Sequence, residues 1–498
     1  MTTTPTTKIV DKRVSIDLLP NDVLLCVFSF HRLLHQRPID RRLPLSVTWK
    51  WHRLAQVCRR WRYLIFASPR HLGLRLVMTN TPSSKPRRLA LDHWPALPIA
   101  IWWEWDQLSP KHEDDVAAAL EHPDRIYEIK LVMSNSIMEK SVAWVEASFP
   151  ALEILHLTSY HYDPMVLPDA FLAASTPSAI PHRLLHVKLT NVYFPTFPQL
   201  LLSSRDLVSL SLRSDRDVIT TFLSPEAITS ALSAASQLKN LSLRLSDEND
   251  GIQGSIHLPS PNHILLPALN EFCFHGPGDY LEDFVSRIHP PLLEQLNVYL
   301  RWPHVVDFPQ LSHFINRTEQ LSSLPHLTSI KLGDGEFQIR HCFRHRPSRQ
   351  RVVRLQLDIW LDWQVSQVHH VCKQLSPLMS SVEQLVIAAS YSPTRLQGET
   401  KPASWLRLFE PFHGVQELEL STHKDQGTQI SHALEQSTWE GVQEVFPALH
   451  SLWLCDFETR AWSVINSFVF LRQVDGRQVT THRSKSLPCI EEFRSESL

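Results

Sequence analysis

Apolar residues alternate with other residues in a short pattern that recurs along most of the chain. The pattern has the form L-x-L, as in LVSLSL at residues 207–212 and LKNLSL at 238–243. It occurs fourteen times between Leu72 and Leu454, with 23 to 34 residues between the ends of successive copies. Alternation predicts β-strands, and this spacing is typical of repeats that stack into a solenoid.

Helical periodicity fills several intervals between these strands. It predicts helices over residues 111–121, 136–149, 226–236, 365–375 and 404–412, and a last apolar helix over 461–471. One strand and one helix cannot bury their apolar faces alone, whereas stacked copies bury a continuous core. The body is therefore predicted to be an α/β solenoid of parallel strands with outer helices, curved because helices are wider than strands. A strand–helix domain without solenoid geometry is the alternative.

Residues 18–66 have a different pattern, with apolar residues at helical spacing. The first helix has its stripe at Val23, Leu24, Val27 and Phe28. A second stripe continues to Leu64, and Ser68-Pro69 ends that helix. Two or three short helices bury too little surface to be stable alone. The segment is therefore predicted to dock on a neighbouring domain or a partner.

The residues of this segment also carry a resemblance. Leu19-Pro20 is followed by Leu24, Leu25 and Phe28, and then by the run Val57-Cys58-Arg59-Arg60-Trp61-Arg62. Together these residues resemble an F-box over about a tenth of the chain. The middle of the segment, 31–45, departs from the usual pattern because it is arginine-rich and holds two prolines. An ordinary helical cap on a larger domain is the alternative.

The resemblance implies that the helical segment docks on a Skp-type adaptor and, through it, on a cullin. The repeats resemble the leucine-rich repeats that follow an F-box in one large class of these proteins. The chain would then be the substrate-recognition subunit of an SCF-type cullin–RING E3 ubiquitin ligase, with the repeats holding an unknown protein substrate. The implied adaptor-binding residues are Leu19, Pro20, Leu24, Leu25, Phe28, Val57, Cys58 and Trp61.

The predicted division of the chain follows from these two patterns. Residues 1–14 are expected to be a disordered N-terminus, 15–70 an F-box helical module, 71–480 a leucine-rich-repeat solenoid and 481–498 a C-terminal tail. One alternative function is a leucine-rich-repeat scaffold that acts without a ubiquitin ligase. A nucleic-acid binder with a basic head is another, and it would show steep salt dependence.

Charge, apolar content, cysteines and missing motifs narrow the range of functions that the sequence allows. Residues 11–71 hold twelve Lys/Arg against four Asp/Glu, which favours an acidic partner for this segment. No apolar run is long enough for a membrane span, and there is no secretory signal pattern. The seven cysteines are scattered and odd in number, as expected for reduced thiols in a cytoplasmic or nuclear protein. With no Gly-rich phosphate loop and no nucleophile signature, the sequence predicts no enzyme activity and no cofactor.

The middle residues of the L-x-L patterns are expected to line the open face of the sheet. Most are polar and no single chemistry recurs, which suits protein recognition. The residues predicted to bind the target are Lys130, His156, Lys188, Asn297, Lys331, Gln356, Glu419 and Trp453. The other middle positions are Arg75, Ala100, Ser211, Ser242, Cys273 and Val386. Trp102 is predicted to point outward as an interface anchor or as a packing residue.

A basic segment, 340–354, contains six arginines and two histidines. Arginines bind phosphate in a bidentate way, so a phosphorylated target segment is one candidate ligand. A solvated loop between repeats is the favoured interpretation, and the lack of interleaved aromatic residues disfavours nucleic acid. The groups His341/Cys342/His345 and His369/His370/Cys372 lack a second ligand pair at zinc spacing, so no metal site is predicted.

Overall fold

The computed structural model describes residues 16–35, 51–69, 71–72, 74–79, 91, 97–103, 117–133, 149–159, 165–166, 183–193, 204–214, 224–245, 263–301, 307–322, 327–333, 336–344, 351–360, 365–389, 401–422, 424–438, 444–455 and 459–484. The chain forms two compact units, Met1–His156 and Leu157–Leu498. This division falls inside the predicted repeat body, and the predicted domain limits stay a prediction.

The first unit begins with short helices. They are the 3₁₀ turn η1 (Ile16–Leu18) and the α-helices α1 (Asn21–His35), α2 (Trp51–Val57) and α3 (Arg59–Ala67). The second predicted stripe is therefore not one continuous helix. Cys58 interrupts it with an extended backbone (φ −156°, ψ 170°), and its Sγ accepts a hydrogen bond from the Trp61 N–H at 3.4 Å. This N-cap satisfies one of the free N–H groups at the start of α3.

Three parallel strands follow these helices in the first unit. They are β1 (Leu76–Thr79), β2 (Ile99–Trp103) and β3 (Ile126–Met133), which follows the 3₁₀ turn η2 (Pro123–Arg125). β2 lies between β1 and β3. The order follows the chain, so each connection crosses back to start the next parallel strand.

The division between the units falls within β4 (Ile154–Ser159). The helices of the second unit are α8 (Pro225–Leu232), α9 (Gly278–Arg287), α10 (Pro309–Arg317), α11 (Glu319–Ser322), α12 (Val365–Gln374), α13 (Ser376–Met379), α14 (Pro402–Phe409), α15 (Lys424–Gln436) and α16 (Thr459–Val474). Its longer strands are β6 (His186–Thr190), β8 (Ser209–Arg213), β9 (Asn240–Arg244), β11 (Glu271–Gly276), β13 (Gln295–Arg301), β14 (Leu327–Gly333), β15 (Glu336–Arg344), β16 (Arg351–Trp360), β17 (Gln384–Ala389), β18 (Glu417–Thr422), β19 (Ser451–Cys455) and β20 (Thr480–Ser484).

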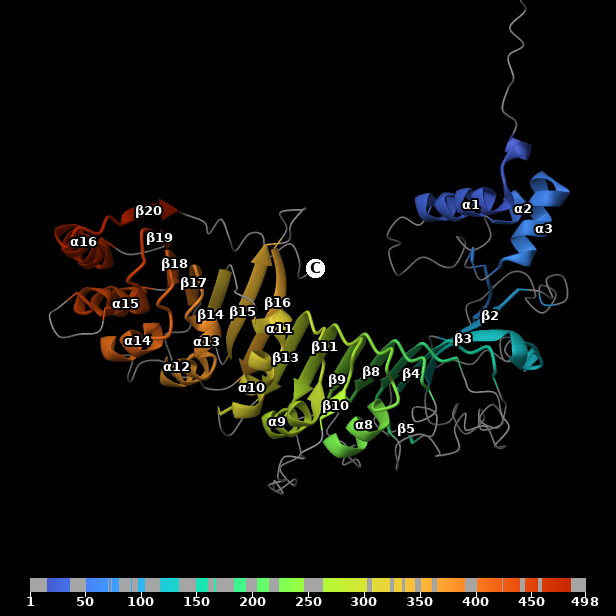
Figure 1. Ribbon diagram of the computed structural model, residues 1–498, viewed down its shortest axis with the longest axis horizontal. Coiled ribbons are helices and arrows are strands. Elements are labelled where there is room, and N and C mark those ends of the chain that lie inside the picture. The colour runs from blue at the N-terminus through green and yellow to red at the C-terminus, as the bar shows by residue number, and fades with distance from the viewer. Residues whose placement is uncertain are drawn as a thin grey trace, which may run out of the picture. The chain divides into compact units, whose positions relative to one another are not determined.

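The two-residue strands β5 (Met165–Val166), β7 (Val192–Tyr193), β10 (Ile264–Leu265) and β12 (Ile288–His289) pair separately from the main sheet. The main sheet of the second unit has the order β4-β6-β8-β9-β11-β13-β16-β15-β14-β17-β18-β19-β20. Helices α8, α9, α10, α12, α14, α15 and α16 lie along one side of these strands (Figure 1). The predicted mixed α/β class with a predominantly parallel sheet is confirmed, and the leucine-rich-repeat solenoid stays a prediction.

Each of the fourteen L-x-L patterns contains a strand, and their apolar residues form the core. Across the second unit, Leu210, Leu241, Phe272 and Leu296 stand in register on neighbouring strands, and all four are buried. The residues between the leucines are therefore on the opposite face, which the helices leave open. From β6 to β16, the polar middle positions therefore form one row on this face.

The sheet departs from the predicted all-parallel order at β15. This strand is antiparallel to both β14 and β16, so the two predicted neighbours are separated. Only Asp334-Gly335 connects β14 to β15, and Asp-Gly is a strong hairpin signal. The basic segment 340–354 is consequently not simply a loop between repeats, because β15 continues to Arg344 and β16 begins at Arg351.

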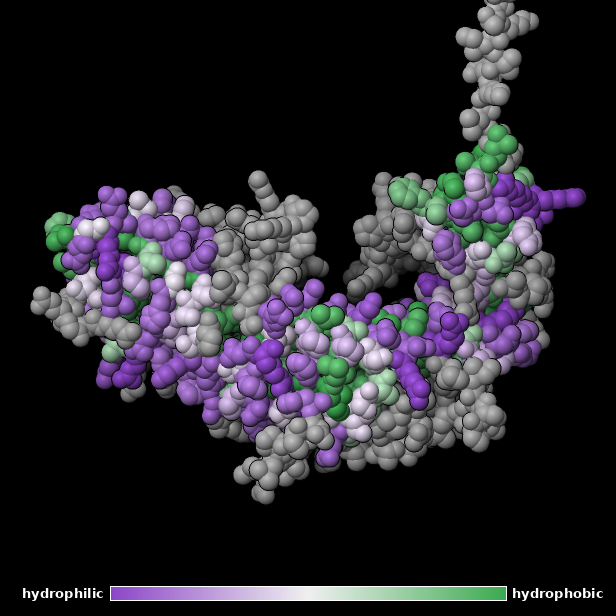
Figure 2. Space-filling view, in the orientation of Figure 1, coloured by the Kyte–Doolittle hydropathy of each residue, from purple (hydrophilic) through white to green (hydrophobic). Residues whose placement is uncertain are grey.

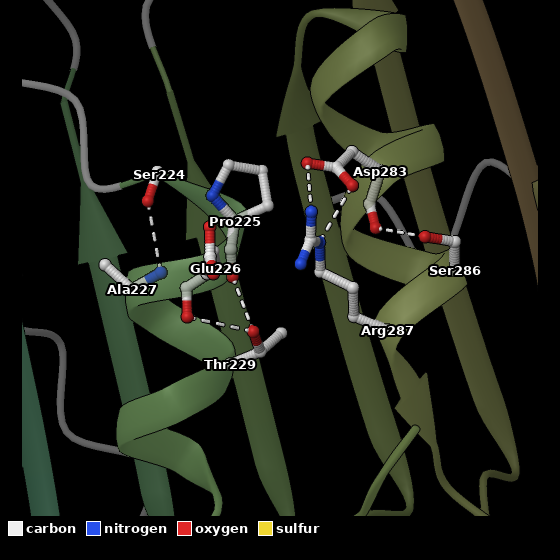
Figure 3. Close-up of polar contacts among 8 residues, drawn as sticks. All are labelled: Ser224, Pro225, Glu226, Ala227, Thr229, Asp283, Ser286 and Arg287. Atoms are coloured by element: carbon white, nitrogen blue, oxygen red, sulfur yellow. Dashed lines mark hydrogen bonds and ion pairs between the residues drawn. The ribbon is translucent and has the colours of Figure 1, made fainter. Parts of the chain in front are cut away.

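Helix starts in the second unit follow ordinary capping chemistry. Ser224 accepts a hydrogen bond from the Ala227 N–H at 3.1 Å, and Pro225 occupies the first turn of α8 (Figure 3). In α9, Arg287 near the C-terminus pairs with Asp283 at 2.8 Å, one turn earlier (Figure 3). The two helices contact each other, and α9 also contacts β11.

The predicted helices are found where the structure describes them. Those at 226–236, 365–375, 404–412 and 461–471 correspond to α8, α12, α14 and α16, and residues 117–120 of the helix predicted at 111–121 are helical. Residues 136–148 and 1–14 lie outside the described residues. β20 extends four residues into the predicted C-terminal tail because it pairs in parallel with β19.

Candidate functional site

Three of the predicted adaptor-binding residues form the interior of the helical module. Leu24 and Phe28 on α1 are buried, and so is Trp61 on α3. The rings of Phe28 and Trp61 meet edge to face, with centroids 4.7 Å apart. These side chains hold α1 against α3, so they are not available to a partner unless the module opens.

Arg60 fixes the Leu-Pro turn to the rest of the module. Its Nη2 donates to the Leu19 carbonyl oxygen at 2.5 Å and to Asn21 Oδ1 at 2.8 Å. Arg62 similarly donates from Nε to the Ala55 carbonyl oxygen at 3.0 Å, which ties α3 to α2. In the sequence these arginines are recognisable only as part of the family pattern, and their backbone contacts could not be predicted from it.

The exposed face of α1 carries an apolar stripe. Val23, Val27 and Phe30 are spaced at i, i+4 and i+7, and all three are exposed. Leu18, Val57 and Tyr63 are further large apolar side chains exposed on this module. Figure 2 shows apolar atoms at the surface of the N-terminal helices. An exposed apolar cluster on a small helical module is typical of a protein-interaction surface.

We name the six residues Leu18, Val23, Val27, Phe30, Val57 and Tyr63 the module surface. Of the predicted adaptor-binding set, only Val57 belongs to it. Pro20 is also exposed, whereas Leu19, Leu25 and Cys58 are half-buried. The assignment of the eight residues to an adaptor stays a prediction, but the structure divides them into an interior group and a surface group.

Three predicted target-binding residues share one row of the open sheet face. Lys188 on β6, Asn297 on β13 and Gln356 on β16 are at the same register, with Ser211, Ser242 and Cys273 between them. Lys188 is exposed, and the other two are half-buried. The structure therefore brings these residues onto one surface, as the L-x-L pattern predicts.

Polar contacts fix the middle of this row. Gln356 donates from Nε2 to Asp358 Oδ2 at 2.9 Å and to the Tyr299 hydroxyl oxygen at 3.3 Å. Burial, together with the nearby Asp358 charge, raises the pKa of Tyr299. Burial and the nearby Glu271 charge also raise the pKa of the Cys273 thiol. Both groups therefore stay protonated at neutral pH, and the row offers hydrogen bonds rather than a nucleophile.

The remaining predicted residues lie elsewhere on the strands. Glu419 on β18 and Trp453 on β19 are register partners, and Glu419 is buried. Trp453 stacks on His482 of β20 with centroids 4.1 Å apart and an interplanar angle of 17°. Lys331 is exposed on β14, and in the first unit His156 is half-buried on β4. Lys130 on β3 pairs with Glu128 at 2.6 Å.

Metal and membrane binding find no support in the described residues. No group of three or more His, Cys, Asp or Glu side chains comes together among them. Cys372 of α12 is fully buried, and burial raises its pKa to about 12. Within the part of the chain that the structure describes, no helix is both long and apolar enough to cross a bilayer.

The helical module matches a known protein family. Residues 16–70 match the family described as F-box-like. The match includes η1 and helices α1 to α3, so this segment is an F-box-like domain. A search of curated proteins finds no match.

Proposed function

We propose that the chain is a substrate-recognition subunit of an SCF-type cullin–RING E3 ubiquitin ligase. The observation that carries the proposal is an exposed apolar surface on a domain that matches the F-box-like family. F-box domains typically bind Skp-type adaptors, and through the adaptor the chain would reach a cullin. The chain itself positions a target and leaves ubiquitin transfer to other subunits.

The module surface has the properties of an adaptor-docking site. Its apolar side chains stand on helices whose own core is filled by other residues, so binding need not unfold the module. Arg53, Arg59 and Arg62 are exposed on α2 and α3. These charges favour an acidic partner surface and would speed association at low salt.

The strands of the second unit support the target-binding part of the proposal. Most neighbours in the sheet are parallel and their order largely follows the chain, with helices on one side, which supports the leucine-rich-repeat interpretation. The other side presents a row of polar side chains from six neighbouring strands. A wide polar surface of this kind is suited to an extended protein segment rather than to a small molecule.

The adaptor assignment is tested by the double substitution Val27→Asp/Phe30→Asp. Both side chains are exposed, at 44% and 64%, so the module stays folded, but two carboxylates would have to be buried in the complex. We expect the amount of co-purified Skp-type adaptor to fall by about tenfold or more. Co-expression, affinity purification of the full chain and quantification of the adaptor provide the measurement.

The matched control is Phe470→Asp/Val474→Asp on α16. These apolar residues are exposed to a similar degree, at 63% and 67%, but belong to the second unit. Adaptor recovery should not change in this variant. If Val27→Asp/Phe30→Asp retains full adaptor binding, the proposal fails; a soluble monomer that never recovers adaptor supports the scaffold function instead.

The alkylation rate of Cys26 provides an independent test of whether the adaptor covers the module surface. It is exposed on α1, next to Val27 and one turn from Phe30. We expect its alkylation by N-ethylmaleimide to slow by about tenfold when the adaptor binds, because a docked surface excludes the reagent. Peptide mass spectrometry on the free chain and the complex gives both rates.

Two other cysteines serve as controls for this alkylation experiment. Cys372 should not react in either state because it is buried and its pKa is raised to about 12. Cys273 is half-buried in the second unit and should react equally in both states. An unchanged Cys26 rate in a complex that demonstrably contains adaptor would place the interface away from the exposed face of α1.

A further inference from the structure

A charged cluster lies on one face of the strands of the first unit. It contains Arg75, Trp102, Tyr127, Glu128 and Lys130. Both cations lie over the indole ring, with the Arg75 guanidinium carbon and the Lys130 ammonium each 4.8 Å from the Trp102 ring centroid. Cation–π contacts of this length orient both side chains. Only Lys130 was predicted to bind a target, and Trp102 was predicted to point outward.

Glu128 contacts both cations of the cluster. Its side chain is buried, and it accepts hydrogen bonds from Arg75 Nη1 at 2.8 Å and from the Tyr127 hydroxyl at 2.9 Å. Its other oxygen is 2.6 Å from Lys130 Nζ. The two cations are therefore held on the two oxygens of one carboxylate.

Two features of β2 and β3 permit this arrangement of side chains. Ala100 on β2 is fully buried between Val77 on β1 and Glu128 on β3, its register partners. Its small side chain lets Arg75 reach across β2 to Glu128. An irregularity of register next to Ala100 leaves Tyr127 without a register partner on β2. Irregularities of this kind re-aim side chains and are frequent beside functional sites.

The charges of the cluster do not cancel. Burial alone would raise the pKa of Glu128, but the hydrogen bond from Lys130 and the charges of Arg75 and Lys130 outweigh it and lower the pKa. Tyr127 stays neutral because burial and the Glu128 charge raise its pKa. Two cations against one carboxylate leave one net positive charge.

The excess charge is open to solvent. The Arg75 side chain is 30% exposed and the Lys130 side chain 38%. Among the described residues, Arg75 contacts Tyr127 and Glu128 through Nη1, so its Nε and Nη2 groups are further donors. The Lys130 ammonium likewise has N–H groups beyond the one that contacts Glu128. Since Glu128 and Trp102 already restrict both side chains, a ligand would order them at little entropic cost.

We propose that the Arg75–Lys130 cluster binds the carboxylate of an acidic side chain in an extended segment of the target protein. The inference rests on the proposed function, because it assigns a partner chemistry to part of the predicted target-binding surface. One carboxylate matches one excess charge and can bridge a guanidinium and an ammonium held close together. A nucleic acid would require cations in a longer row and bases stacked on free aromatic faces, whereas Trp102 already lies under two cations.

The test uses fluorescein-labelled decapeptides and the full chain co-purified with its adaptor. The probe peptide alternates Glu and Ser, and its controls carry Gln or Lys in place of Glu. Fluorescence anisotropy should show binding of the Glu peptide only, with an affinity that Lys130→Gln weakens by about fivefold or more. Lys130→Gln leaves the Arg75–Glu128 pair in place, and Lys130→Arg, which keeps the charge, should restore binding.

Lys373→Gln is the matched control because it removes the same charge from an exposed position on helix α12, outside the predicted target-binding residues. It should leave the affinity unchanged. Equal weakening by Lys373→Gln, equal binding of the Gln peptide, or no effect of Lys130→Gln would overturn the inference. Tighter binding of a decathymidylate with the same dependence on Lys130 would overturn it in favour of nucleic acid.

The adaptor distinguishes failure of the inference from failure of the proposed function. Recovery of adaptor with each Lys130 variant should equal that of the unchanged chain, since the F-box-like domain is untouched. Intact adaptor binding without Glu-peptide binding overturns the acidic-segment site alone. A chain that recovers no adaptor, but binds the Glu peptide in a Lys130-dependent way, keeps the site and overturns the ligase assignment.

Discussion

Phe28→Ala is expected to unfold the N-terminal helical module and to abolish adaptor binding with it. Phe28 is buried and meets Trp61 edge to face, so its removal leaves a cavity between α1 and α3. Such a truncation lowers the free energy of unfolding by about 3–5 kcal/mol, and this figure includes the loss of the aromatic pair. A module of this size has only a few kcal/mol of stability to lose.

Phe30→Ala is the matched control for this prediction. Phe30 is two residues further along the same helix but on its exposed face. Its removal should leave amide hydrogen exchange in α1 and α3 slow while it weakens adaptor binding. Phe28→Ala should instead show fast exchange in both helices. Slow exchange in Phe28→Ala combined with lost binding would mean that Phe28 contacts the adaptor directly, as the sequence alone suggested.

The contrast between these two phenylalanines shows where sequence reasoning about the module was limited. Its helices and their amphipathic character were readable from the spacing of apolar residues. The assignment of faces was not, because Val23 and Leu24 are adjacent, as are Val27 and Phe28, so the stripe spans both sides of α1. Only packing against Trp61 shows that Leu24 and Phe28 are on the inner side.

The break between α2 and α3 at Cys58 could not be predicted from the sequence, for a different reason. Apolar spacing continues smoothly from Trp51 through Leu64, so periodicity predicts one helix. The break depends on the extended backbone of Cys58 and on its thiol, a weak acceptor that seldom marks an N-cap.

The strands were easier to predict than their neighbours in the sheet. L-x-L alternation identifies a strand locally, and all fourteen patterns contain one. It does not say which strands pair, so the placement of β15 between β14 and β16 was missed, although Asp334-Gly335 gave a usable hairpin signal. The Arg75–Lys130 cluster could not be predicted from the sequence because it joins Arg75, the residue before β1, to side chains of β2 and β3 through an irregularity of register.

Three half-buried or buried arginines of the described residues donate hydrogen bonds to backbone carbonyl groups of earlier segments. In the first unit Arg125 donates to the Leu97 carbonyl oxygen at 3.0 Å. In the second unit Arg317 donates to the carbonyl oxygens of Val285 and Ile288, at the end of α9. Each contact supplies a hydrogen-bond donor to a backbone carbonyl group. Arg472 is the most buried example, and its removal should have the largest effect.

Arg472→Ala is expected to lower the free energy of unfolding of the second unit by about 3–5 kcal/mol. The side chain is 2% exposed, pairs with Glu444 at 3.0 Å and donates from Nη2 to the carbonyl oxygens of Val445 and Phe446 at 2.8 and 2.9 Å. Phe446 has a left-handed backbone (φ 53°), which is unfavourable for a non-glycine residue and needs such support. Arg472→Lys should not rescue stability, because an ammonium group cannot reproduce the planar arrangement of donors.

Arg477→Ala separates this effect from simple loss of an ion pair. Arg477 pairs with the same Glu444 oxygen, but its side chain is 45% exposed, and exposed pairs contribute about 0–1 kcal/mol. Urea unfolding of the full chain, followed by hydrogen exchange in α16 and β19, should show a large shift for Arg472→Ala and almost none for Arg477→Ala. Equal shifts would mean that Glu444 pairing, rather than the two carbonyl contacts, secures the end of the sheet. The unequal result follows from burial, because Arg472→Ala removes the donors of two carbonyl groups whose residues, Val445 and Phe446, are buried.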